Sequence, residues 1–240
     1  MWDQWRAVSW NPVGQYTSNL AMDTGELHHL LFRWLHVLTA MVWIGHTWSL
    51  VFASNGRRPD TDTWMRGWAG ATWLTGVSLL IFVYYAGGAL TTPSQSLWMG
   101  IGVGVSVLLL AWLLYDAIWT LLAQQPMLAA AVSLLILSGI AQGLAEFMTG
   151  RGVFIHVGAT LGIILVNDAN QRPARITNNA VIAPAVILFM VSNHFPLIYG
   201  TSRPWLVAPT LTGMGCAVGL SMRWLSLRRR VDLKVGTMTT

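Results

Sequence analysis

The sequence predicts an all-α fold, a polytopic bundle of helices that crosses a membrane. Of its 240 residues, 54% are hydrophobic and only 10% are charged, whereas an ordinary soluble domain carries roughly 25% charged residues. Apolar runs of about 20 residues recur along the whole chain, and a helix of that length crosses the hydrocarbon core of a bilayer. The 14 tryptophans fit the same class, because tryptophan concentrates at membrane–water interfaces.

The apolar runs predict about seven transmembrane helices with short connections. The longest connection, near residues 54–67, contains Asn55, Gly56 and Pro59. Because the connections are short, helices that are consecutive in the chain are expected to pack as neighbours. The expected spans are residues 28–53, 68–90, 97–122, 127–148, 152–168, 178–199 and 205–226.

The positions of Lys and Arg predict the orientation of the bundle. If the N-terminus is outside, ten of these residues fall on one side of the membrane and three on the other. The positive-inside rule then places the C-terminus in the cytoplasm. The expected organisation is an exposed N-terminal segment (1–26), a transmembrane helical domain (27–227) and a basic cytoplasmic tail (228–240). The net charge of +5 is accounted for by the loops and the tail, so no nucleic-acid partner is expected.

Two features of the apolar runs indicate helix packing. The single cysteine, Cys216, lies inside such a run. One cysteine excludes an intrachain disulfide, a Cys-ligated iron–sulfur cluster and the C-x-x-C-H attachment of a covalent haem c.

The third span contains GIGVGVS, in which Gly100 and Gly104, like Gly102 and Ser106, are four residues apart. This spacing of small residues predicts a close contact between helices.

Three histidines on three different spans are expected at a similar depth, in the outer half of the membrane. They are His36, His156 and His194, and His29 lies on the same helix face as His36 because the two are seven residues apart. A neutral imidazole in hydrocarbon must be hydrogen-bonded or ligated, and ionisable groups inside a membrane are functional candidates. Because haem is largely apolar and two facing imidazoles can hold its iron, the pattern predicts one or two b-type haems. His36, His156 and His194 are the expected iron ligands, with His29 as a further candidate.

Other polar residues of the same zone are candidates to line a substrate pocket. In the fourth span Ser138, Gln142 and Glu146 recur at four-residue spacing, which places them on one helix face. Glu146 is the candidate proton acceptor. Gln142 and Asn193 complete the predicted catalytic set.

The fifth span carries a polar stripe of its own. His156, Thr160 and Asn167 share a face, because eleven residues return a helix to within roughly 20°. This stripe is therefore expected to face the interior of the bundle. His46 has only Asp116 near its own depth and is expected to be a hydrogen-bonded packing residue.

Five segments of the chain together resemble one family. They are RWLHVLTAMVWIG in the first span, TWLTGVSLLIFVYYAG in the second, WLLYDAIW in the third, FMTGRGVFIHVGA at the fourth-to-fifth junction and NNAVIAPAVILFMVSNHFPL in the sixth. The family that they resemble is the N-terminal membrane domain of the bacterial membrane-bound urate hydroxylases, or urate oxidases, which carry a cytochrome c domain at the C-terminus. The resemblance covers about residues 30–225.

The resemblance implies an integral redox protein of the bacterial inner membrane. In that family the oxidation of urate, in purine breakdown, is linked to electron transfer toward cytochrome c. His36, His156 and His194 match the family's motif histidines. Because this chain ends soon after Arg230, the expected partners are a separate periplasmic cytochrome c or other membrane subunits.

Three functions remain open from the sequence. The first is the haem-binding redox protein, which predicts haem absorbance. The second is a cofactor-free structural or assembly subunit, which scaffolds a larger membrane complex through its Gly-rich and Trp-rich helix faces. The third is a metal-binding membrane protein or transporter, because His and Glu also suit zinc or non-haem iron. An absorbance spectrum and a metal analysis of the purified protein discriminate among the three.

Overall fold

The computed structural model describes residues 24–53, 63–88, 90–92, 94–171 and 175–238. These residues are helical apart from short connections, and their only extended pairing is an isolated bridge between Thr91 and Met148. The predicted all-α class is therefore confirmed. Most of the predicted N-terminal segment and residues 54–62 of the longest connection lie outside the described residues.

The helices are long, and two of them change to π-helix before they end. In chain order they are α2 (Thr24–Trp48) with η2 (Ser49–Ala53), α3 (Thr63–Ser78) with η3 (Leu79–Tyr85), α4 (Leu97–Leu121), α5 (Pro126–Ala145), α6 (Gly150–Gln171), α7 (Ile176–Ser192), α8 (Pro196–Tyr199) and α9 (Pro204–Met238). Proline begins α5, α8 and α9, because its missing N–H has no partner in the first turn of a helix anyway.

Six segments within these helices are long and apolar enough to cross a membrane. They are Leu27–Ala53, Thr63–Tyr85, Leu97–Leu121, Pro126–Ala145, Gly150–Asp168 and Pro204–Arg229. The remaining predicted span, 178–199, is divided in the structure, since α7 ends at Ser192 and Pro196 starts the separate α8. Proline lacks the N–H that a continuing helix needs. With 17 residues α7 is shorter than the roughly 20 that a span requires, so the count of seven and the orientation stay predictions.

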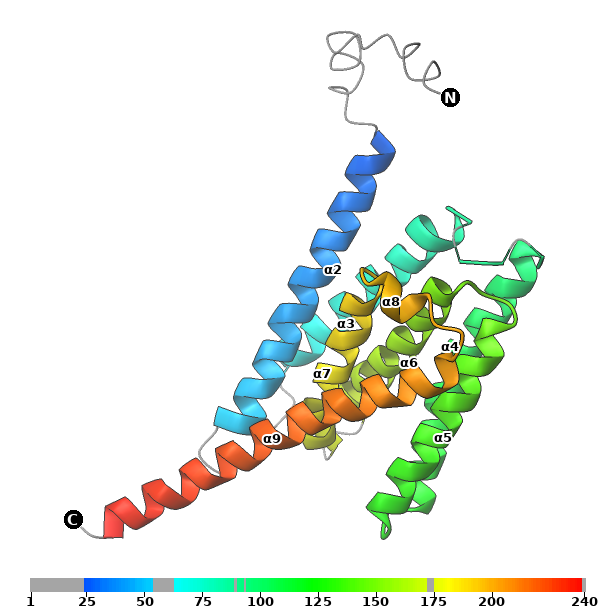
Figure 1. Ribbon diagram of the computed structural model, residues 1–240. Helices are drawn as coiled ribbons and strands as arrows, with labels where there is room; N and C mark the ends of the chain where they lie inside the picture. The colour runs from blue at the N-terminus through cyan, green and yellow to red at the C-terminus, as the bar shows by residue number, and fades with distance from the viewer. Residues whose placement is uncertain (1–23, 54–62, 89, 93, 172–174, 239–240) are drawn as a thin grey trace, which may run out of the picture.

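The last helix is longer than its predicted span. α9 continues as a helix through Met238, whereas the apolar run in the sequence ends near residue 226. The described part of the predicted basic tail is therefore helical. In Figure 1 this end of α9 extends away from the rest of the bundle.

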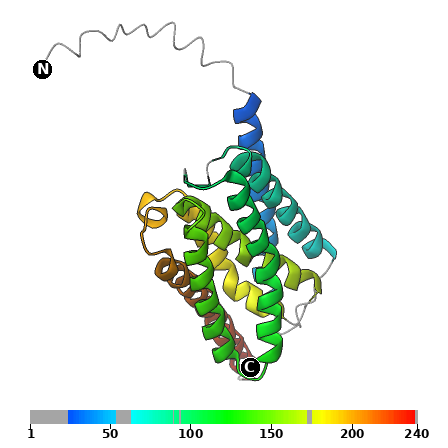
Figure 2. The ribbon, with the colours of Figure 1, turned by 90° about the vertical axis from the view of Figure 1, so that its right-hand side faces the viewer.

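α6 is the central helix of the bundle (Figures 1 and 2). It packs against α3, α4, α5, α7 and α9. In the apolar window of α6, 56% of the residues are buried, against 17–28% in the other five spans. Polar side chains on α6 are thus shielded by protein on most sides, and they must find partners there.

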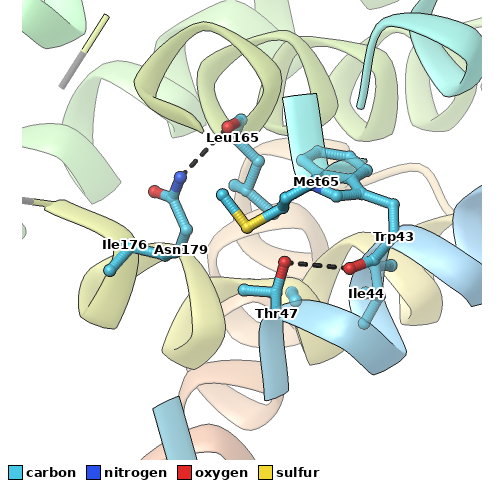
Figure 3. Close-up of a pocket in the computed structure, with 8 residues that line it drawn as sticks. Trp43, Ile44, Thr47, Met65, Leu165, Ile176 and Asn179 are labelled. Atoms are coloured by element: carbon cyan, nitrogen blue, oxygen red, sulfur yellow. Dashed lines mark hydrogen bonds between the residues drawn. The ribbon is translucent and has the colours of Figure 1, made fainter. Parts of the chain in front are cut away.

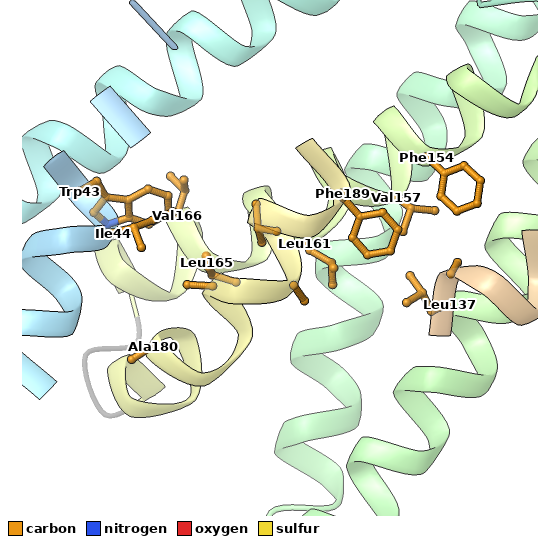
Figure 4. Close-up of a cluster of buried hydrophobic side chains, with 14 of the residues drawn as sticks. Trp43, Ile44, Leu137, Phe154, Val157, Leu161, Leu165, Val166, Ala180 and Phe189 are labelled. Atoms are coloured by element: carbon orange, nitrogen blue, oxygen red, sulfur yellow. The ribbon is translucent and has the colours of Figure 1, made fainter. Parts of the chain in front are cut away.

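The apolar core follows α6 along its length (Figure 4). Phe154, Val157, Leu161 and Leu165 are all buried on this helix. The ring of Phe154 stacks on Phe189 of α7 with centroids 6.1 Å apart. This core fixes α6 against α7 and so sets the position of the polar residues between its apolar ones.

Two glycines let α7 and α9 approach closely. A Cβ atom on Gly215 of α9 would collide with the backbone of Ala185, and one on Gly219 would collide with the backbone of Val181. Glycines four residues apart form one small-residue stripe, which allows two backbones to touch. α7 is therefore held in the bundle by close contact with α9 as well as with α6.

Candidate functional site: a buried tyrosine–histidine pair

His156 is the most deeply buried ionisable side chain on α6. It lies in the second turn of the helix and has no exposed surface. Its Nδ1 is 2.8 Å from the carbonyl oxygen of Gly152, one turn earlier. Because a carbonyl oxygen only accepts, Nδ1 carries a hydrogen and donates it. The neutral ring then presents Nε2 as an acceptor, and the hydroxyl of Tyr85 donates to it at 2.7 Å.

Gly104 of α4 makes room for this Tyr85–His156 pair. A Cβ at position 104 would lie 2.5 Å from Nε2 of His156, 2.7 Å from the Tyr85 hydroxyl and 2.8 Å from Cε of Met148. Any side chain larger than glycine would therefore displace one of these groups. The small-residue motif that the sequence presents as a helix contact thus also forms one wall of the site.

Backbone contacts hold Tyr85 against the start of α6. The carbonyl oxygen of Leu90 accepts hydrogen bonds from Thr149, at 2.7 Å from its N–H and 3.2 Å from its hydroxyl. Close by, the N–H of Thr92 donates to the carbonyl oxygen of Phe147 at 3.4 Å. The segment after η3 is thereby tied to the junction between α5 and α6. This link fixes the end of η3, where Tyr85 is located.

His36 belongs to a different polar group, between α2 and α3. Its Nδ1 is 3.1 Å from the hydroxyl of Thr75, which in turn lies 3.3 Å from the hydroxyl of Thr39. The imidazole rests on Gly76, where a Cβ would come within 2.9 Å of Cε1. The polar partners that the structure shows for His36 come from α2 and α3, and none of them is a histidine.

Four of the other five predicted site residues are exposed, and the fifth, Asn193, is half-buried. His29 and His194 are both exposed. Gln142 donates to Oε1 of Glu146 at 3.3 Å, and both of these side chains are exposed on α5. Asn193 uses its Nδ2 to cap its own helix, through a 3.2 Å bond to the carbonyl of Phe189. Within the described parts of the chain, no three His, Cys, Asp or Glu side chains are grouped to hold a metal ion.

As its side chain stands, His156 does not fit an axial ligand of haem. Both ring nitrogens are engaged, by Gly152 and Tyr85, and the ring has no open face. The predicted ligation of b-type haem by His36, His156, His194 and His29 would need these side chains to rearrange. It stays a prediction from the sequence.

Two hollows among the described helices offer no alternative cofactor site with a histidine. One is a cavity of about 10 Å³ between α2, α3, α6 and α7 (Figure 3), which has room for a single water. Around it, Asn179 donates to the carbonyl of Leu165 at 3.0 Å and Thr47 donates to that of Trp43 at 2.9 Å. The other is an open groove of about 570 Å³ along α4, lined by apolar side chains with Gly102 and Ser106.

Tyr85 and a second polar cluster are functional candidates that were not predicted from the sequence. The guanidinium of Arg175, at the N-terminus of α7, lies 3.0 Å from Asp116 of α4 and 3.6 Å from Asp168 of α6. Its other nitrogen donates to Thr120 at 3.4 Å. From the sequence, Arg175 counts only as one of the ten loop and tail charges that predict the orientation. The signal that could have revealed the cluster is the occurrence of two aspartates inside apolar runs.

Together these features define a class: a helical, multi-span membrane protein whose central helix carries a buried, hydrogen-bonded imidazole. Residues 53–171 match a family model described as urate oxidase N-terminal. This part of the chain is therefore a urate oxidase N-terminal-like domain, which confirms the resemblance drawn from the sequence. No curated protein and no solved structure matched the chain. Tyr85, Gly104 and His156 lie inside the matched range, whereas His36 and His194 lie outside it.

Proposed function

We propose that the protein is a membrane redox protein related to the urate hydroxylases, which oxidises urate or a similar purine and passes electrons to a separate cytochrome c. The observation that carries this proposal is the Tyr85–His156 pair, because all of its parts, including Gly104, fall within the urate oxidase N-terminal-like domain. The family and the apolar helices also support a place in the bacterial inner membrane.

The pair supplies a proton acceptor next to an oxidisable phenol. If Tyr85 gave one electron to the partner cytochrome c, its O–H bond would break and the proton would form an N–H bond at Nε2 of His156. Tyr85 would then be a neutral radical and His156 an imidazolium, whose Nδ1–H would still donate to Gly152. An electron from the substrate would restore the phenol as the proton returned to Tyr85, and a two-electron oxidation of the substrate would take two such cycles. The 2.7 Å contact between the two side chains suits this short proton transfer.

The test is urate-dependent reduction of ferricytochrome c by the full chain in detergent or nanodiscs, followed by absorbance. We expect reduction by the native protein and its loss in both Tyr85→Phe and His156→Gln. Tyr84→Phe is the matched control, because Tyr84 is the neighbouring phenol on η3. Absence of urate-dependent reduction in the folded native protein contradicts the proposal.

The predicted b-type haem is tested on the same samples. A dithionite-reduced minus oxidised spectrum with sharp bands would show that haem binds, and replacement of His36, His156 or His194 would then identify the ligands. A flat spectrum from protein expressed with ample haem would remove haem from the proposal.

A second function, a structural or assembly subunit of a larger membrane complex, is favoured by α4. Only 17% of its apolar window is buried although it is the most hydrophobic span, and a Cβ on its Gly102 would meet nothing. Such a face is suited to a further helix. This function predicts neither cofactor nor urate-dependent electron transfer in the purified chain. It also predicts that native electrophoresis of mild-detergent extracts finds the protein only in a larger complex.

A further inference from the structure

The last turns of α9 concentrate basic residues. The basic segment, defined as Arg223 to Lys234, contains five basic residues and one acidic residue, Asp232. A helix needs about 20 residues to cross the hydrocarbon core of a bilayer, and that length, counted from Pro204 at the start of α9, ends at Trp224. The basic segment therefore lies where an upright spanning helix leaves the hydrocarbon core. This end of α9 also extends away from the other helices (Figure 1).

Three arginines of the basic segment have no acidic partner within the described part of the chain. The side chains of Arg223, Arg228 and Arg229 are exposed, and the structure shows no ion pair between them and an Asp or Glu of that part. Arg175, by contrast, lies beside two carboxylates. The N–H donors of these three guanidinium groups are thus available to an anion from outside the bundle. Phosphate oxygens match the geometry of a guanidinium group well.

One of the three arginines lies over a tryptophan ring. The guanidinium carbon of Arg228 is 3.7 Å from the ring centroid of Trp224, one helical turn earlier. A guanidinium that meets a ring with its flat face keeps its N–H groups, which lie in its plane, directed outward. Tryptophan is itself favoured at the level of the lipid headgroups, because its ring is amphipathic. The contact therefore holds a phosphate-binding group at the level where the hydrocarbon core ends.

An apolar face of the helix lies beside these arginines. Trp224, Leu227 and Val231 follow one another at spacings of three and four residues, which places them on one side of the helix. Their side chains are 50%, 49% and 60% exposed, so the bundle leaves much of this face uncovered. A helix whose apolar face is bordered by cations is typical of a segment that lies against a membrane surface. The apolar side chains can then enter the edge of the hydrocarbon core while the arginines meet the headgroups.

We propose that the basic segment of α9 binds the phosphate groups of anionic phospholipids at the membrane surface. Arg223, Arg228 and Arg229 donate to the phosphate oxygens, and Trp224 and Leu227 enter the boundary of the hydrocarbon core. The excess of basic over acidic residues favours anionic over zwitterionic lipids, since each cation is attracted to the negative surface. The binding is noncovalent and independent of the proposed redox chemistry. It fixes the end of the helix that holds α7 in the bundle.

The test is native mass spectrometry of the full chain from micelles that contain equal amounts of phosphatidylglycerol and phosphatidylcholine. We expect the native protein to retain mainly phosphatidylglycerol. Each basic residue near an anionic surface contributes about fivefold in binding. Replacement of Arg228 and Arg229 by Gln should therefore reduce the retained phosphatidylglycerol by at least about tenfold. Equal retention of the two lipids by the native chain, or an unchanged preference in this double variant, overturns the proposal.

Three further variants separate the basic segment from exposed charge in general. Replacement of Arg151 and Arg203, two exposed arginines outside the basic segment, by Gln is the charge-matched control and should leave the preference unchanged. Replacement of Arg228 and Arg229 by Lys keeps both charges and should keep most of the preference. Asp232→Asn removes the acidic charge and should increase retention, so the test does not depend on variants that lose binding. An equal loss in the control variant overturns the assignment to the basic segment.

Hydrogen–deuterium exchange then locates the contact and identifies its anion. The full chain is placed in phosphatidylcholine nanodiscs with and without phosphatidylglycerol. We expect peptides that cover the basic segment to exchange more slowly with the anionic lipid, and high salt to weaken this protection because it screens the charges. Inorganic phosphate and a short RNA are added to the phosphatidylcholine nanodiscs in parallel. Equal protection by either one would assign the segment to a soluble anion or to nucleic acid, and no protection by phosphatidylglycerol would exclude the lipid; each of these results overturns the proposal.

Discussion

The two ends of α6 satisfy buried polar groups in different ways. At its beginning, His156 is neutral and fully buried, with one donor and one acceptor that match its two nitrogens. Toward its end, Asp168 is almost as deeply buried, but it and a second acid, Asp116, both lie close to the guanidinium of Arg175. The first arrangement is complete without water and carries no net charge. The second is built from charged groups and is partly open to its surroundings.

The largest loss of stability is expected from a change of Arg175, the cation between Asp116 and Asp168. Arg175→Gln should lower the free energy of unfolding by about 3 to 5 kcal/mol, because it leaves two neighbouring carboxylates without their common partner. Denaturant unfolding in detergent measures the loss, and Arg175→Lys, which keeps the charge, is the control. A loss as large in Arg175→Lys would mean that Arg175 acts by packing on Tyr115 instead.

A smaller loss of stability is expected at Gly104, which forms one wall of the Tyr85–His156 pair. Gly104→Ala should cost about 3 kcal/mol of stability, because the new methyl group collides with His156, Tyr85 and Met148. Gly102→Ala is the matched control, since its methyl group meets nothing within 4 Å and should change stability by less than about 0.5 kcal/mol. Thermal unfolding of both variants decides the matter, and equal midpoints would show that α4 does not press on the pair.

Removal of the Tyr85 hydroxyl should lower the free energy of unfolding by less again. Tyr85→Phe leaves Nε2 of His156 buried without a donor, which costs about 2 kcal/mol. Tyr84→Phe serves as the control and should leave the unfolding free energy unchanged. This loss should vary little between neutral and alkaline pH, because the native pair is uncharged. A pH-dependent loss would show that the pair carries a charge, as the groups at the other end of α6 do.

The smallest effect is expected at His36, outside both ends of the comparison. Thr75→Val removes the hydroxyl that faces Nδ1 of His36 and should cost about 1 kcal/mol. His36 is only half-buried, so the ring can find other partners. Chemical denaturation measures this change. A loss as large as that of Tyr85→Phe would place His36 in an environment as demanding as that of His156.

The sequence sufficed for the membrane class and for the importance of α6, because both depend on local pattern. Apolar runs predict spans, and the stripe of His156, Thr160 and Asn167 predicts a helix with polar groups to satisfy. The division of α7 from α8 is harder to predict. Pro196 is a visible break in the sequence, but the run of apolar residues around it predicts one span to 199. Length and composition of a run do not show where a helix is interrupted.

The partners of the buried groups could not be predicted from the sequence. The three histidines at one apparent depth suggested a common site, yet depth along a helix says nothing about the direction in which a side chain points. In the structure the side chain of His156 is hydrogen-bonded to that of Tyr85, and the side chain of His36 to that of Thr75. Tyr85 ends a π-helical segment, whose turn differs from the α-helical period, so periodicity does not predict its face. Asp116, Asp168 and Arg175 meet only because three separate helices converge.

The glycine contact between α7 and α9 has a consequence for how the protein is made. α7 is too short to span a bilayer unaided, contains Pro184 and is among the most buried of the helices. Its close-fitting neighbour is α9, which leaves the ribosome after it. During synthesis α7 therefore has α6 and α2 to contact before α9 is complete. Final placement of α7 must be a late event in biogenesis, and a chain cut off before α9 would leave it inserted without its tightest contact.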